Sequence, residues 1–135
     1  FSVHMVREWK EAAGFVGEPT GPVEVTVPVQ GKPTTIDISA ELHRACESLL
    51  PPITETMLDL ISRVEPEYQA RVRNNVILAG GGSQIRGLVA RLEKALGEIG
   101  GGKVTAVEDP VYAGSNGSLA IALDAPESDW EKLAG

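Results

Sequence analysis

The chain has 135 residues and a net charge of −7, with 42% hydrophobic and 23% charged residues, which is ordinary for a soluble protein of single-domain length. No apolar run is long enough for a membrane span, the N-terminus lacks a signal-peptide pattern, and the acidic residues are spread along the chain. We therefore expect a cytoplasmic protein with no membrane span and no nucleic-acid partner. Because the sequence starts at Phe1, inside a predicted helix, we also expect a piece of a longer protein.

Residues 1–50 are predicted to form a helix, a strand hairpin and a second helix. Apolar residues recur at helical spacing before Gly14, which ends the first helix. Valines alternate with polar residues over 23–29, the period of a half-buried strand, and residues 34–38 can return beside it. Ser39 is placed to cap the next helix.

Residues 51–135 are predicted to form an α/β layer. The proline pair that opens this part stops one helix and begins another, so we place a subdomain boundary after residue 50. The apolar run at 76–79 predicts a strand buried on both faces, residues 103–107 predict a second buried strand, and a small-residue helix is expected over 115–123. The order strand, helix, strand, helix indicates an α/β layered unit.

Three consecutive glycines, Gly80, Gly81 and Gly82, follow the first of these strands and precede a helix. Because glycine has no Cβ, a ligand can lie directly against such a turn, and the next helix offers unpaired N–H groups. The turn could hold a nucleotide, although a strand-to-helix turn without a ligand explains it equally well. It is neither a Walker A loop nor a dinucleotide fingerprint.

A second cluster lies near the N-terminus, where Arg7, Lys10 and Glu11 fall at i, i+3 and i+4 and share one helix face. Two cations and an acid on one face could hold a ribose and an adenine edge. A solvated helix face is the ordinary explanation of such a cluster.

The sequence contains no motif typical of a metal site or of a hydrolase active site. His4 and His43 stand far apart without metal-ligand spacing, and no Gly-x-Ser-x-Gly nucleophile motif is present. Cys46, the single cysteine, lies among apolar residues and is predicted to be a buried hydrophobe. We therefore assign neither a catalytic residue nor a metal ligand.

Taken together and in order, the motifs resemble the bacterial actin-like family of the MreB type. Residues 6–11 look like the first helix of the upper subdomain of the large actin domain, and residues 75–88 look like the family's adenosine motif. Residues 108–123 are similar to its closing segment. The resemblance implies the C-terminal part of an actin-like, ribonuclease-H-like ATPase fold, with residues 1–50 as the upper and residues 51–135 as the lower large-domain subdomain.

The resemblance also implies a nucleotide site with two walls. Arg7, Lys10 and Glu11 would contact ribose and adenine from one side. The other wall would consist of the glycine turn and the residues after it, namely Gly80, Gly81, Gly82, Ser83, Gln84 and Ile85. The ligand would be ATP or ADP with Mg²⁺, but the phosphate loops and the Mg²⁺ ligands would lie outside this chain, so the chain alone should not hydrolyse ATP.

The implied function of the intact protein is to bind ATP, to self-associate into filaments and to hydrolyse ATP as it polymerises. Residues 31–34, 45–53 and 130–133 most resemble the actins that organise magnetosome chains, which implies magnetosome-associated proteins as partners. Two alternatives stay open. The chain could be a fragment of another actin-fold ATPase, such as a sugar kinase or an Hsp70-type protein, or it could be an interaction module that binds no nucleotide.

Overall fold

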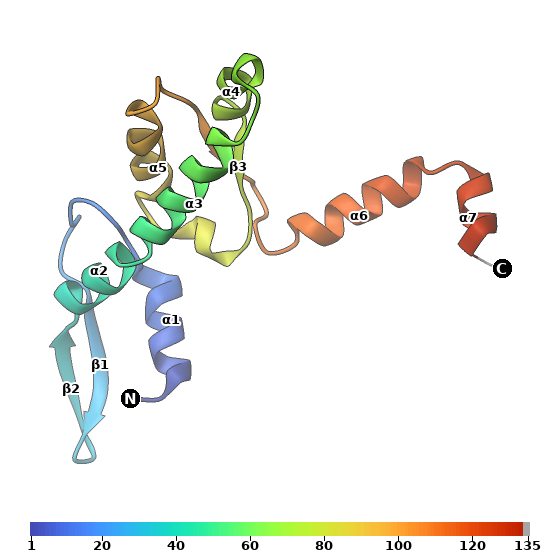
Figure 1. The fold of residues 1–135 in the computed structure, drawn as a ribbon. Helices are drawn as coiled ribbons and strands as arrows, with labels where there is room; N and C mark the ends of the chain where they lie inside the picture. The colour runs from blue at the N-terminus through green and yellow to red at the C-terminus, as the bar shows by residue number, and fades with distance from the viewer. Residues whose placement is uncertain (134–135) are drawn as a thin grey trace.

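The computed structural model describes residues 1–133, so the last two residues of the predicted lower subdomain lie outside the described part. A helix and a hairpin come first, three helices follow, and a strand-helix-strand unit precedes two final helices (Figure 1). The elements are α1 (Val3–Ala13), β1 (Glu24–Val29), β2 (Lys32–Asp37), α2 (Ser39–Glu47), α3 (Leu50–Ser62), α4 (Pro66–Arg73), β3 (Val76–Leu78), the 3-10 helix η1 (Gly81–Gln84), α5 (Leu88–Gly97), β4 (Val104–Ala106), α6 (Ala113–Asp124) and α7 (Glu127–Leu133).

The hairpin forms where the valine alternation predicts it. β1 pairs antiparallel with β2 and Val29 lies opposite Lys32, which leaves Gln30 and Gly31 as a two-residue turn. Both turn residues have positive φ angles, 50° and 78°, as a type I′ turn requires. Val27 is fully buried while its neighbours along the strand are exposed, so the prediction of a half-buried strand is confirmed.

The predicted cap at Ser39 is wrong, because Ser39 is already the first residue of α2. Its hydroxyl instead donates to a carboxylate oxygen of Asp37 at 2.5 Å and accepts the N–H of Val23 at 2.7 Å. The Asp37 carboxylate also accepts the N–H of Ser39, and the hydrogen bonds from Ser39 lower the pKa of Asp37. Ser39 thus joins the start of α2 to the residue before β1.

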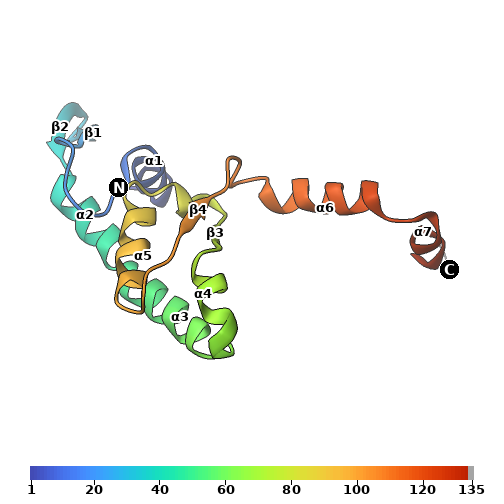
Figure 2. The ribbon, with the colours of Figure 1, turned by 90° about the horizontal axis from the view of Figure 1, so that it is seen from above.

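The proline pair acts as predicted. α2 ends at Glu47, and α3 starts at Leu50 with the prolines in its first turn, where the missing N–H groups have no helical partner to lose. Leu50 and Ile61 of α3 are buried. Ser48 and Leu49 between the two helices keep right-handed helical backbone angles, so α3 continues along nearly the same line as α2 (Figure 2).

The strands β3 and β4 form a two-stranded parallel sheet, with Val76 opposite Val104, and α5 lies between them in the chain and packs against β4. The prediction that β3 is buried on both faces is wrong, and the prediction of β4 as a second buried strand holds for one of its three residues. Ile77 is 68% exposed, and Val104 is the buried residue of β4. In the described residues no third strand or second helical layer covers the other face of this sheet (Figure 2), which is why alternate residues face solvent.

One hydrophobic core joins the two halves of the chain. Its buried side chains come from both sides of residue 50 and centre on Leu92 and Leu96 of α5, which are fully buried. The other buried members are Val16, Leu42, Cys46, Leu50, Ile61, Leu88 and Val104. The burial of Cys46 confirms its prediction as a small core residue. The division of the chain into two subdomains at residue 50 stays a prediction.

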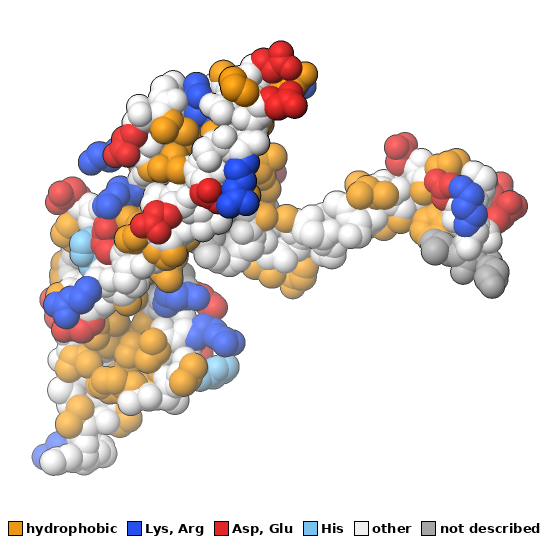
Figure 3. Space-filling view, in the orientation of Figure 1, with side chains coloured by type: hydrophobic (Ala, Val, Ile, Leu, Met, Phe, Trp, Pro, Cys, Tyr) orange, Lys and Arg blue, Asp and Glu red, His pale blue; other side chains and the backbone are white. Residues whose placement is uncertain are grey.

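The last two helices project from the body as an arm (Figures 1 and 2). The small-residue helix exists as predicted, but no other element packs closely on its Gly114 or Gly117, since a Cβ added to either would meet no atom within 4 Å. Leu119, Ile121 and Leu123 are between 58% and 79% exposed, and hydrophobic atoms lie along the arm in Figure 3. None of the helices in residues 1–133 has the length and apolar character that a membrane crossing requires.

Candidate functional site

The end of α1 and the segment before α5 lie side by side, although they are far apart in sequence. The N–H of Val16 donates to the carbonyl of Arg86 at 2.8 Å, and the N–H of Arg86 donates to the carbonyl of Gly14 at 3.2 Å. Phe15 and Arg86 form an isolated parallel bridge between these bonds. This backbone pairing brings together the two motifs that the sequence singled out.

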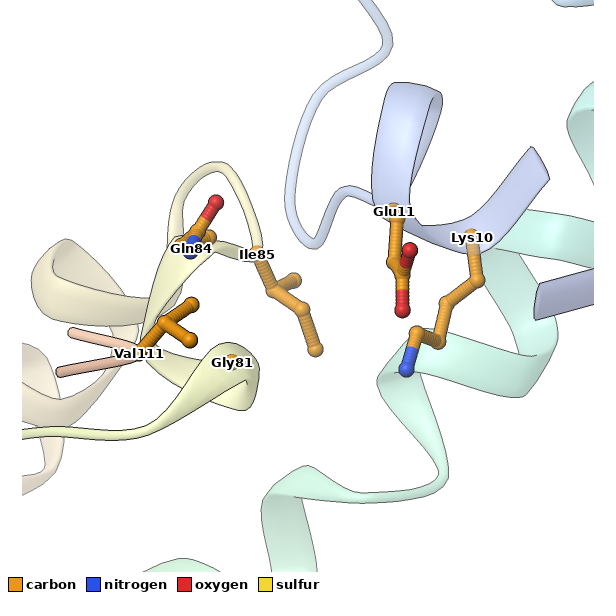
Figure 4. A pocket seen from close by; sticks show the side chains of 6 residues that line it. All are labelled: Lys10, Glu11, Gly81, Gln84, Ile85 and Val111. Atoms are coloured by element: carbon orange, nitrogen blue, oxygen red, sulfur yellow. The ribbon is translucent and has the colours of Figure 1, made fainter. Parts of the chain in front are cut away.

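A cavity of about 290 Å³ lies between the two motifs (Figure 4), close to the lower end of the range for small-molecule sites. Lys10 and Glu11 of α1 extend into it from one side, and Ile85 faces them from the other. Six residues line the cavity, namely Lys10, Glu11, Gly81, Gln84, Ile85 and Val111. Within residues 1–133 neither Lys10 nor Glu11 forms an ion pair, so both charges are available to a ligand.

Five of the nine predicted contact residues line this cavity. The other four, Arg7, Gly80, Gly82 and Ser83, do not. Arg7 lies about one turn before Lys10 and Glu11 on α1 and is exposed. The Ser83 hydroxyl donates to the carbonyl of Gly80 at 2.8 Å, so these two residues hold the turn in shape from within.

The predicted helix after the glycines is confirmed, but it starts later than the sequence pattern indicates. Helical spacing begins at Ile85 in the sequence, whereas the glycines lead into the 3-10 turn η1 and α5 begins only at Leu88. Between them Ile85 is extended, and Gly87 has a φ of 82°. The N–H groups beside the glycine turn therefore belong to η1 rather than to the N-terminus of α5.

Sequence reasoning missed Val111, which lines the cavity from the loop after β4. The N–H of Gly80 donates to the carbonyl of Pro110 at 2.8 Å and holds this loop against the glycine turn. Val111 is 64% exposed, so it presents an apolar surface to the cavity. No local pattern in the sequence announces this contact, because it arises from a backbone bond between distant segments.

Glu47 is a second residue that the sequence did not single out. One of its carboxylate oxygens accepts the N–H of Gly17 and a guanidinium N–H of Arg91, both at 2.8 Å, and lies 3.4 Å from Nε2 of His43. The hydrogen bond from Gly17 lowers the pKa of Glu47, and the charge of Arg91 acts in the same direction against partial burial. Glu47 thus joins α2, the segment after α1 and α5.

Acid should weaken the fold through Glu47. Because the folded-state pKa of Glu47 lies below its ordinary value of 4.5, its contribution to stability is complete above that value and is lost as the pH falls through the folded-state pKa. We expect the free energy of unfolding in urea, followed by circular dichroism, to fall in that range. Glu47→Gln should lower stability by about 1 kcal/mol at neutral pH and flatten this pH dependence. Parallel pH profiles for the two proteins would contradict the assignment.

The remaining titratable groups do not gather into a metal site. In the part of the chain that the structure describes, no group of three His, Cys, Asp or Glu side chains could hold a metal ion. His4 is exposed, and His43 stacks on the ring of Phe15 with centroids 5.0 Å apart. His4 is therefore a surface residue, and His43 is a partly buried residue at the edge of the core.

Comparison with solved structures identifies the fold. A MamK double helical filament matches 93% of this chain with a TM-score of 0.88 and 39% sequence identity, and the match covers 39% of the MamK chain. The chain has a partial actin-like fold. The fold class and the resemblance to bacterial actin-like proteins are therefore confirmed. No family model matches the chain.

The actin-like relatives agree at the sequence level. The actin-like protein MamK of Paramagnetospirillum magneticum is 40% identical over 98% of this chain, and that of Magnetospirillum gryphiswaldense is 39% identical over 92%. The chain spans only 38% and 34% of these relatives' lengths. A non-polymerising MamK variant bound to AMPPNP matches 83% of the chain with a TM-score of 0.79 and 38% identity. The chain is thus similar to part of an actin-like filament protein.

Proposed function

We propose that this chain is the C-terminal part of a bacterial actin-like cytoskeletal protein and supplies the adenosine-binding side of its ATP site. The observation that carries the proposal is the cavity between α1 and the glycine turn, because two motifs that are weak signals separately face each other across it. The AMPPNP-bound state of a similar MamK variant supports the same ligand class.

The cavity offers the groups that a nucleoside needs. The Lys10 ammonium can donate hydrogen bonds and the Glu11 carboxylate can accept them, which suits ribose hydroxyls and the polar edge of a base. Ile85 and Val111 provide an apolar flank for the flat faces of the base. The glycine backbone at Gly81 lets the ligand approach closely, since no Cβ stands in the way.

The four predicted residues that do not line the cavity keep a proposed role. Arg7 has a long exposed side chain on the same helix as Lys10, and it would reach a ligand that extends beyond the cavity. Gly80, Gly82 and Ser83 would shape the turn or contact the ligand through backbone groups. All nine residues therefore form the proposed adenosine site.

For the intact protein we propose ATP binding with Mg²⁺, hydrolysis coupled to polymerisation, and self-association into filaments in the cytoplasm. The filament structures of similar MamK proteins support the assembly. The phosphate loops and the Mg²⁺ ligands would come from other parts of the protein, so this chain alone should have no ATPase activity. Magnetosome-associated proteins are the proposed partners, and nucleic acids are not among them.

The test is a titration of the ¹⁵N-labelled chain with adenosine, ADP and ATP, followed by NMR. We expect weak binding that shifts the amide signals of Lys10, Gly81 and Ile85, with similar affinities for the three ligands because phosphate anchors are not part of the site. Lys10→Ala should weaken binding less than about fivefold, since an exposed ionic contact contributes about 1 kcal/mol at most. Lys94→Ala, an exposed lysine on α5 away from this cavity, is the control and should bind like the parent.

Two outcomes would contradict this account. A strong preference for ATP over adenosine would mean that the chain holds phosphate-binding groups of its own. The absence of shifts at the cavity with saturating adenosine would favour the alternative of an interaction module with a purely structural glycine turn.

A further inference from the structure

We propose that Glu47 is a positioning residue for the adenosine cavity, because its carboxylate fixes the segment 14–17 on which the spacing of the two walls depends. The proposal rests on the proposed function. Glu47 does not line the cavity itself, so it would act on the ligand only through the backbone that it holds.

The first argument is the number of elements that meet at one carboxylate. Glu47 lies at the end of α2, Gly17 closes the segment after α1, and Arg91 lies on α5. The N–H of Gly17 and the guanidinium of Arg91 both donate to the same Glu47 oxygen at 2.8 Å. The Glu47 side chain is only 27% exposed, so these bonds are partly shielded from competing water.

The second argument is the position of segment 14–17 between the two walls. It leaves α1 only three residues after Glu11, and its Gly14 and Val16 are hydrogen-bonded to Arg86. Arg86 directly follows Ile85, which lines the cavity from the opposite side. A displacement of this segment therefore moves Ile85 relative to Glu11.

The third argument concerns what else holds the segment. The ring of Phe15 is stacked on His43 of α2 at 5.0 Å between centroids, and the guanidinium carbon of Arg86 lies 6.0 Å from the same ring centroid. These contacts hold the middle of the segment. The Glu47 bond holds its far end at Gly17, where a Cβ would meet no atom within 4 Å, so packing does not replace that bond.

The experiment compares Glu47→Ala and Glu47→Gln with the parent chain by NMR titration with adenosine, at a temperature where all three are folded. Alanine removes the acceptor, whereas glutamine keeps a carbonyl oxygen for the N–H of Gly17. We expect Glu47→Ala to weaken adenosine binding about fivefold, within the range of residues that act on a site without touching the ligand, and Glu47→Gln to restore part of it. The amide proton of Gly17 should shift upfield in Glu47→Ala, and the signals of Ile85 and Glu11 should move before ligand is added.

Asp59→Asn is the matched control, because it removes a carboxylate that forms an exposed ion pair outside this network, between Asp59 of α3 and Arg63 just after the helix, at 2.6 Å. It should leave the adenosine affinity unchanged. If Glu47→Ala lowers the melting temperature but binds adenosine with parental affinity, Glu47 is merely structural and the positioning role is wrong. If the parent itself shows no shift with adenosine, the proposed function fails first.

Discussion

Replacing Gly87 with alanine should unfold most of the chain. Gly87 has a φ of 82°, and a Cβ built there would lie 2.3 Å from the carbonyl oxygen of Val16. Non-glycine residues in this region cost about 1 to 3 kcal/mol in backbone strain, and the clash must also be relieved. The atom that it strikes belongs to the segment paired with Arg86, so relief would separate α1 from α5. We expect a total loss of about 3 kcal/mol or more, a large part of the stability of a small domain.

Urea denaturation followed by circular dichroism measures this loss. Gly97→Ala is the control, because Gly97 closes α5 in helical geometry and an added Cβ meets no atom within 4 Å. It should stabilise the chain slightly, by less than about 1 kcal/mol. A Gly87→Ala chain that unfolds at the parental urea concentration would show that the contact between Val16 and Gly87 can relax without cost.

Replacing Gly81 with valine should abolish adenosine binding while leaving the chain folded. The cavity is partly lined by Gly81, yet an added Cβ there meets no atom within 4 Å, so the valine side chain has room in the empty protein. The branched side chain would then occupy space that the base requires. Valine at this position should not strain the backbone, because Gly81 is not one of the glycines with a positive φ.

We expect the affinity for adenosine to fall by more than about tenfold, which corresponds to about 1.4 kcal/mol or more, with a melting temperature close to the parental one. Gly117→Val, on the projecting α6, should change neither binding nor the NMR signals of the cavity. If Gly81→Val folds and binds adenosine as the parent does, the glycine turn is purely structural. The two glycine variants thus separate a backbone position that the fold needs from one that the ligand needs.

Local patterns predicted the helices and the hairpin because periodicity and turn residues report directly on backbone conformation. Burial was harder to predict. The apolar run at 76–79 reads as a strand covered on both faces, yet Ile77 is exposed, because burial depends on which surfaces lie opposite and not on the run itself. Ser39 does not cap α2 because the helix already begins at this residue, and because its hydroxyl oxygen accepts the N–H of the distant Val23.

The candidate site shows the same division. Five of the nine predicted residues line one cavity. These residues could be predicted only from the resemblance, because the spacing of the two motifs in the sequence says nothing about their distance in space. Val111 and Glu47 could not be found in this way. Val111 lies at the cavity because of a backbone hydrogen bond between Gly80 and Pro110. The role of Glu47 follows from its hydrogen bonds with Gly17 and Arg91. Neither has a sequence signature.

The stability of the α6 arm itself depends on whether its apolar residues are covered. α6 carries exposed apolar residues, Leu119, Ile121 and Leu123, and no charged face that would suit it to solvent. Covering one such side chain contributes about 1.5 to 3 kcal/mol, so a surface that covers all three contributes about as much as a small domain's entire stability. Such a surface would act thermodynamically as a ligand of the folded α6. Because α6 makes few contacts with the rest of residues 1–133, the helicity of the arm, rather than the unfolding midpoint of the body, would then depend on the concentration of that surface.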